Sequence, residues 1–155
     1  MRFPFAVAIL AFATAAGTAS SATAQTSSAH LGPRVSYDFD FEDFGLGAQL
    51  GVPIARHLEF YPSFDYFFVD PGSLTQLNVD LKYRIAPQSL RWLYVGTGLN
   101  VTRSSFLERN HTDTGLNLFG GYESLKGKVH PFVEVRIIAG SGSRAQVAGG
   151  LNFTL

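Results

Sequence analysis

Strict alternation of apolar and polar residues is the feature that most constrains this chain. It is clearest over residues 75–85, where leucine, valine, tyrosine and isoleucine occupy every second position and polar or charged residues fill the positions between. A β-strand points successive side chains to opposite faces, whereas a helix would scatter the same residues around its circumference. The segment therefore predicts a strand with one apolar and one polar face.

The same pattern recurs along most of the chain. The segments that show it are 31–41, 44–55, 58–69, 75–85, 92–102, 114–125, 129–140 and 145–155. A strand of about ten residues, tilted against the membrane normal, is long enough to cross the apolar layer of an outer membrane. The expected fold is therefore all-β: an eight-stranded antiparallel up-and-down transmembrane β-barrel.

The first residues are expected to lie outside this fold. Residues 1–24 have the features of a cleavable signal peptide: Arg2, an apolar stretch, and a small-x-small cleavage site at 22–24. A membrane anchor is the alternative, but the apolar stretch is short for a spanning helix. Residues 25–30 are expected to be a flexible lead-in, and residues 31–155 the barrel. Because no later segment has the apolar run of a transmembrane helix, a membrane location would require a closed barrel.

Composition excludes several classes of function. The 155 residues suffice for one domain, and twelve basic residues balance twelve acidic ones, so no nucleic-acid partner is expected. The absence of cysteine excludes disulfides, thiolate metal sites and thiol nucleophiles. The lysines are Lys82, Lys126 and Lys128 alone, whereas a soluble domain usually covers its surface with lysine and glutamate.

The polar faces are expected to point into the barrel and the apolar faces to lipid. The polar faces carry glycines and opposite charges, and aromatic residues gather near strand ends, where interfacial girdles lie. The inward charges would be Arg34, Asp38, Asp40, Glu59, Asp65, Asp80, Lys82, Arg84, Glu123, Glu134 and Arg136. Because an eight-stranded barrel is just wide enough for its own side chains, we interpret them as a structural salt-bridge network that fills the lumen. The alternative is an ion path. The seven acids exceed the four bases, so one carboxylate is expected to be protonated or to bind a cation.

The connections between the expected strands sort by charge. The connections at 56–57, 86–91 and 126–128 hold Arg56, Arg91, Lys126 and Lys128 and no acid. In a meander these three share one side, which we expect to be periplasmic, together with both chain ends. The long connection at 103–113 is then extracellular. Four prolines fall near the periplasmic rim, and a bulge is expected near Pro62.

Together these features resemble the small outer-membrane β-barrel family of the OmpA-transmembrane-domain and OmpX type. The resemblance rests on the signal peptide, the eight alternating segments and the C-terminal strand 145–155, whose last aromatic residue is Phe153. It implies an outer-membrane location in a Gram-negative bacterium and contact with membrane lipids and lipopolysaccharide. It also implies recognition of the C-terminal strand by the outer-membrane assembly machinery, and a monomer.

The function expected from this resemblance is a structural one, in envelope integrity or surface interaction, with no catalytic residue, cofactor or metal. The first alternative is a small porin-like pore or a passive binder of hydrophobic molecules. The second is a lipid A-modifying barrel enzyme, for which the candidates are His111 with Ser104 and Ser105 in the 103–113 connection. His30, His57 and His130 fall on the periplasmic side. A soluble, secreted lipocalin-like barrel is the third alternative.

Overall fold

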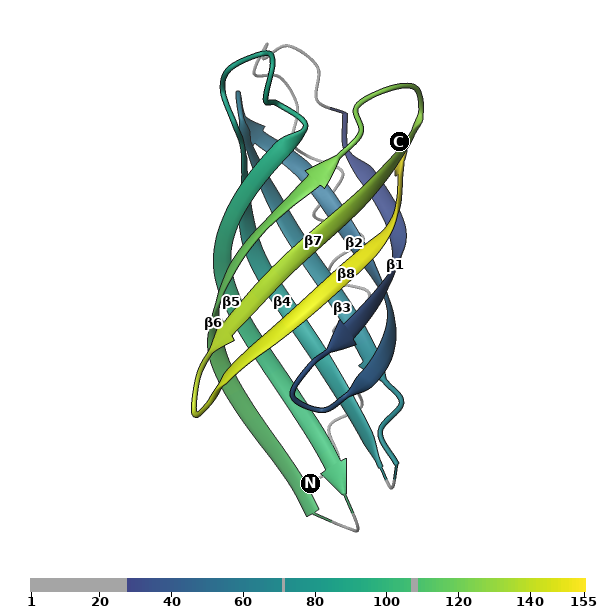
Figure 1. Ribbon diagram of the computed structural model, residues 1–155, viewed down its shortest axis with the longest axis vertical. Coiled ribbons are helices and arrows are strands. Elements are labelled where there is room, and N and C mark those ends of the chain that lie inside the picture. The colour runs from purple at the N-terminus through teal and green to yellow at the C-terminus, as the bar shows by residue number, and fades with distance from the viewer. Residues whose placement is uncertain (1–27, 71, 107–108) are drawn as a thin grey trace.

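The described residues of the computed structural model, 28–70, 72–106 and 109–155, form eight antiparallel strands. Each strand pairs with the next, and β8 pairs with β1, so that the sheet closes into a barrel (Figure 1). The strands are β1 His30–Asp38, β2 Asp43–Ala55, β3 Leu58–Phe67, β4 Ser73–Arg84, β5 Leu93–Phe106, β6 Arg109–Glu123, β7 Val129–Ala139 and β8 Ser143–Thr154. The predicted eight-stranded fold is confirmed. The expected signal peptide lies outside the described residues.

No helix in the described part of the chain is long and apolar enough to cross a membrane.

Closure depends on a pairing between the two ends of the described chain. Leu31 lies opposite Phe153 and Tyr37 opposite Val147, and the Leu155 amide donates to the Ala29 carbonyl over 2.9 Å. The start of β1 and the C-terminus therefore share one end of the barrel, which we call the terminal end. In Figure 1 it is the upper end, and the β7–β8 turn lies at the opposite end.

The two faces of the sheet differ sharply in polarity. On the outer face Leu118 is 63% exposed and Leu116 60%, whereas inside the barrel Lys82 and Glu123 are 0% exposed. Over most of the sheet, strand alternation places apolar side chains outward and polar ones inward. The molecule is therefore built the opposite way from a soluble barrel, whose apolar face is inside.

The β5–β6 connection corrects one prediction. The long connection expected at 103–113 is largely strand: the hairpin pairs Arg103 with Thr112, Ser104 with His111 and Ser105 with Asn110. Apolar–polar alternation marks a strand only where one face is buried. In this part of the hairpin the outward positions 103, 105, 112 and 114 and the inward His111 are exposed, so a polar sequence forms regular strand.

Two further boundaries differ from expectation. The lead-in was expected to run to residue 30, but His30 starts β1 and is 3% exposed. The bulge expected near Pro62 is absent from the described strands, because Pro62 pairs in register with Val79. Pairing with β2 stops at Ser63 and resumes at Phe60 in the same register, so the missing proline donor interrupts the ladder without shifting it. The register shift lies instead at Pro53/Ala55.

Candidate functional site in the barrel lumen

Most of the charged residues predicted for the lumen lie there. Ten of the eleven are buried inside the barrel: Arg34, Asp38, Glu59, Asp65, Asp80, Lys82, Arg84, Glu123, Glu134 and Arg136. The eleventh, Asp40, does not lie in the lumen, because it is exposed in the turn between β1 and β2. The carboxylate of Asp38 accepts hydrogen bonds from the amides of Asp40 (2.9 Å) and Phe41 (3.2 Å), which ends β1 before Asp40 can point inward.

The first group of charges lies toward the terminal end. We call Glu59, Lys82, Arg84 and Glu123 the rim cluster. Lys82 Nζ lies 2.8 Å from Glu123 Oε2 and 3.2 Å from Glu59 Oε2. Arg84 bridges the same two carboxylates, with Nε 2.6 Å from Glu59 Oε1 and Nη2 2.7 Å from Glu123 Oε2. Two cations and two carboxylates thus form a compact set with no net charge.

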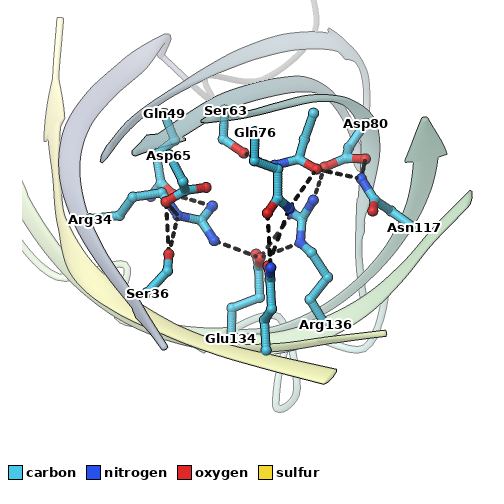
Figure 2. A network of polar contacts seen from close by, with 12 residues as sticks. Arg34, Ser36, Gln49, Ser63, Asp65, Gln76, Asp80, Asn117, Glu134 and Arg136 are labelled. Atoms are coloured by element: carbon cyan, nitrogen blue, oxygen red, sulfur yellow. Dashed lines mark hydrogen bonds and ion pairs between the residues drawn. The ribbon is translucent and has the colours of Figure 1, made fainter. Parts of the chain in front are cut away.

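The second group lies deeper, and Figure 2 shows it. We call Arg34, Asp65, Asp80, Glu134 and Arg136 the central cluster. Arg136 reaches Asp80 Oδ2 over 2.7 Å and Glu134 Oε1 over 2.9 Å. Arg34 reaches Asp65 Oδ1 over 3.2 Å and Glu134 Oε1 over 3.4 Å, so Glu134 joins the two guanidinium groups. These side chains come from β1, β3, β4 and β7 and cross the lumen.

Three aromatic residues lie between the clusters. Tyr61, Tyr94 and Phe119 form a buried set with ring centroids 6.0 Å apart for Tyr61–Phe119 and 6.3 Å for Tyr94–Phe119. Lys82 of the rim cluster lies 4.3 Å from the Tyr61 centroid, and Arg136 of the central cluster lies 4.6 Å from the Phe119 centroid. This aromatic layer therefore has a cation against it from each cluster.

Neutral polar side chains donate hydrogen bonds to three of the buried carboxylates. Ser36 Oγ donates to Asp65 (2.7 Å), Asn117 Nδ2 to Asp80 (2.7 Å) and Asn152 Nδ2 to Glu123 (2.7 Å). Buried charge is tolerated only when it is paired and hydrogen-bonded in this way. The arrangement fills the lumen with mutually dependent side chains.

Two further residues lie in the lumen that are not among the predicted ones. Arg144 falls in an expected connection, but alternation continued from β8 would place it inward. Its Nη1 lies 3.7 Å from Asp38 Oδ2, and its Nη2 donates to Thr102 Oγ1 over 2.7 Å. His30 falls in the expected lead-in, and its Nε2 lies 3.8 Å from Glu59 Oε2. With Asp40 outside and Arg144 inside, six acids face five bases rather than seven facing four. No group of three or more metal-ligating side chains among the described residues could hold a metal ion.

The residues named for an enzyme lie on the β5–β6 hairpin. The register brings Ser104 directly opposite His111, and His111 Nε2 lies 3.1 Å from Asp113 Oδ1. No hydrogen bond of the described residues joins Ser104 to His111. The side chain of His111 is 72% exposed and that of Asp113 43%, so this pair is solvated rather than held in a closed site.

Comparisons with known proteins support the fold. No protein-family model matches the chain, and no curated protein matches it. The N-terminal β-barrel domain of Pseudomonas aeruginosa OprF matches 83% of this chain and 97% of its own, at 14% identity and a TM-score of 0.70. Neisserial surface protein A matches 82% and 94%, at 15% identity and a TM-score of 0.59. Ail, the attachment invasion locus protein of Yersinia pestis, matches 83% and 97%, at 12% identity and a TM-score of 0.50. These similar structures are small outer-membrane barrels of eight strands, so the predicted resemblance in fold is confirmed.

Proposed function

We propose that this chain is an outer-membrane β-barrel protein with a plugged lumen, and that its role is structural, in envelope integrity or surface contact. The observation that carries the proposal is the reversed polarity of the barrel. Its outside is apolar, while its inside holds ten buried charged side chains that the strand pattern also placed there. A sheet surface this apolar needs a hydrocarbon environment, because exposed apolar patches of this extent are not stable in water.

The outer face carries the apolar band that a membrane location requires. Its exposed side chains include Leu46, Phe64, Leu77, Leu81, Val95, Leu99, Leu116, Leu118, Val135 and Ile137. Aromatic residues border this band: Tyr83, Trp92 and Tyr122 are exposed near the terminal end, and Phe44, Tyr66 and Phe68 near the other. Such a girdle at each interface is typical of outer-membrane barrels.

The charges of the connections support an orientation. Arg56, Arg91, Lys126 and Lys128 all lie in connections at the terminal end, which we propose to be periplasmic. Membrane lipids and lipopolysaccharide would then surround the band. The assembly machinery would recognise β8, whose outward positions alternate up to Phe153. We propose that the closed barrel is a monomer.

A gel experiment tests the membrane barrel. Cells expressing the full chain are fractionated, and each fraction is run on a detergent gel with and without boiling. A closed membrane barrel is expected in the outer-membrane fraction and to migrate differently before and after boiling. A soluble periplasmic protein with no such shift would contradict the proposal and favour the lipocalin-like alternative.

A conductance experiment tests the plug against the pore. The aromatic layer and the two clusters span the lumen, and each member is 7% exposed or less. Purified protein in a planar bilayer is therefore expected to give no steady, large conductance steps, with an open porin as the positive control. Steady steps from the folded, heat-modifiable form would show an ion path.

A third experiment addresses the lipid A-modifying alternative. Lipid A from overexpressing cells is compared by mass spectrometry with lipid A from cells that carry the Ser104→Ala/His111→Ala variant. We expect identical spectra, because no hydrogen bond of the described residues joins Ser104 to His111 and the His111 side chain is exposed to solvent. A modified species that appears only with the unsubstituted chain would establish an enzyme.

A further inference from the structure

An apolar groove of about 350 Å³ lies on the outside of the barrel over β5, β6 and β7. Gly120 lies at its centre, and the outward side chains that line it include Leu93, Val95, Tyr122, Val133 and Val135. Gly120 lies opposite Val95 on one neighbouring strand and Val135 on the other. The groove is thus a gap between two valines where the central strand has no side chain.

Packing does not force a glycine at this position. A Cβ added to Gly120 would lie 3.4 Å from the Tyr94 carbonyl oxygen and 3.8 Å from Val95 Cγ1, both ordinary contacts. At Gly121, which faces the lumen, a Cβ would lie 2.5 Å from Tyr94 Cζ, which is too close. The inner glycine makes room for the Val133 carbonyl oxygen and the Tyr94 ring, whereas the outer glycine leaves a space that no atom of the described residues fills.

Cations lie just beyond the terminal end of this groove. β5 begins at Leu93 and β6 ends at Glu123, so the connections 85–92 and 124–128 flank the groove at that end. They carry Arg91, Lys126 and Lys128, all exposed, and no acidic residue. Tyr122, on the groove wall, is 44% exposed and lies at the level where an interfacial tyrosine is expected.

We infer that this groove binds an acyl chain of an anionic glycerophospholipid, with the lipid phosphate held by Arg91, Lys126 and Lys128. The inference rests on the proposed function, since the groove must face lipid. Within a bilayer, lipid tails are as apolar as leucine, so apolar burial alone does not favour one lipid over another. The preference of the groove for a particular lipid therefore depends on the fit of the tail and the charge of the headgroup. The groove supplies the fit and the three cations supply the charge preference.

The test uses the full chain purified in detergent. Native mass spectrometry measures retention of phosphatidylglycerol against phosphatidylcholine with identical acyl chains. Phosphatidylglycerol is expected to bind more tightly, and removal of one cation is expected to weaken it about five-fold. In the variant Arg91→Gln/Lys126→Gln/Lys128→Gln the two lipids should bind equally. Equal binding of both lipids to the unsubstituted chain would overturn the inference.

A second variant tests the groove itself. Gly120→Leu fills the gap and is expected to abolish retention of the lipid. The matched control is Gly149→Leu on β8, which lies beyond the groove wall formed by Val133 and does not line the groove. Gly149 also lies between two outward valines, Val35 and Val133, and its added Cβ would lie 3.4 Å from the Phe132 carbonyl oxygen. If both variants retain phosphatidylglycerol like the unsubstituted chain, the groove is not the site.

The same protein samples distinguish failure of the proposed lipid site from failure of the proposed membrane barrel. Heat-modifiable migration reports the closed membrane barrel and does not depend on a bound lipid. A normal gel shift without lipid preference would overturn the lipid site alone, whereas loss of the shift in the unsubstituted chain would contradict the proposed function.

Discussion

Each buried charge in the lumen is held by partners on other strands. Arg136 is 1% exposed and contacts Asp80 on β4 and Glu134 two positions before it on β7. Asp80 also accepts a hydrogen bond from Asn117 on β6. A buried ion pair adds little net stability, because desolvation offsets the attraction, but removal of one partner leaves an uncompensated charge.

The substitution Arg136→Met is therefore expected to destabilise the barrel by about 3–5 kcal/mol. It leaves Asp80 without its cation, while Glu134 keeps the longer ion pair to Arg34 and the hydrogen bond from the Tyr94 hydroxyl. The free energy of unfolding is measured by urea titration in detergent, with loss of the folded gel band as the readout. Asp80→Asn/Arg136→Met should lose less stability than Arg136→Met alone, since the net charge of the central cluster is then the same as in the unsubstituted chain. Arg91→Met, at an exposed position, is the control. Equal stability of Arg136→Met and Arg91→Met would mean that the pairs do not hold the lumen.

Adjacent glycines provide a second prediction at this scale. Gly121→Ala is expected to cost about 1–3 kcal/mol, because its Cβ would overlap the Val133 carbonyl oxygen and the Tyr94 ring. Gly120→Ala, one residue earlier and on the outer face, should change stability little, because its Cβ meets only ordinary contacts. Thermal unfolding of both variants in the same detergent compares them. A larger loss for Gly120→Ala would reverse the assignment of the two faces.

At the scale of the strand, sequence alone could predict the segments that face lipid on one side and the lumen on the other. The period-two pattern of 75–85 matches β4 Ser73–Arg84 closely. The period-two pattern does not predict strands whose two faces are both exposed to solvent, because neither face then requires apolar residues. The β5–β6 hairpin continues to Phe106 and Arg109 through serine, asparagine and threonine, and its pairing follows from the register of the preceding strand. The pattern also misplaces the end of β1, because that end is set by one turn in which the Asp38 carboxylate accepts hydrogen bonds from two backbone amides.

The end of the β5–β6 hairpin is expected to be dispensable for the barrel. Deletion of residues 105–110, with Ser104 and His111 joined by Asn-Gly, removes pairs that lie beyond the outward apolar band. The variant should retain the heat-dependent gel shift. Deletion of residues 77–82, which removes the centre of β4 and two lumen charges, should abolish it. If the shorter hairpin also fails to fold, the hairpin has a structural role that its exposure does not reveal.

For the molecule as a whole, alternation could predict which residues enter the lumen but not which of them pair. Arg34 and Glu134 are 100 positions apart and meet across the barrel, as Figure 2 shows. The identity of such partners depends on the stagger of eight strands and on closure, neither of which is encoded by local periodicity. The predicted surplus of acids is too large for a different reason: Arg144 falls in an expected connection and Asp40 in an expected strand, so two strand boundaries are misplaced.

Closure itself can be tested, because the chain has no cysteine. Val35 on β1 lies directly opposite Gly149 on β8, and Gly149 lies opposite Val133 on β7. Paired strands bring Cα atoms to about 4.5–5.5 Å, within disulfide range, whereas strands separated by one other lie about 9–10 Å apart. Mild oxidation should therefore cross-link Val35→Cys/Gly149→Cys, visible as altered migration of the boiled, unreduced sample.

The matched control is Val35→Cys/Val133→Cys, whose cysteines both face outward but flank β8 rather than pair with each other. It should stay reduced under the same conditions. Cross-linking of the control but not of the first pair would mean that β8 does not lie between β1 and β7, and the sheet would then be open or differently ordered. Cross-linking of the first pair alone joins the first strand to the last, and a sheet joined in this way has no free edge through which the polar backbone would meet lipid.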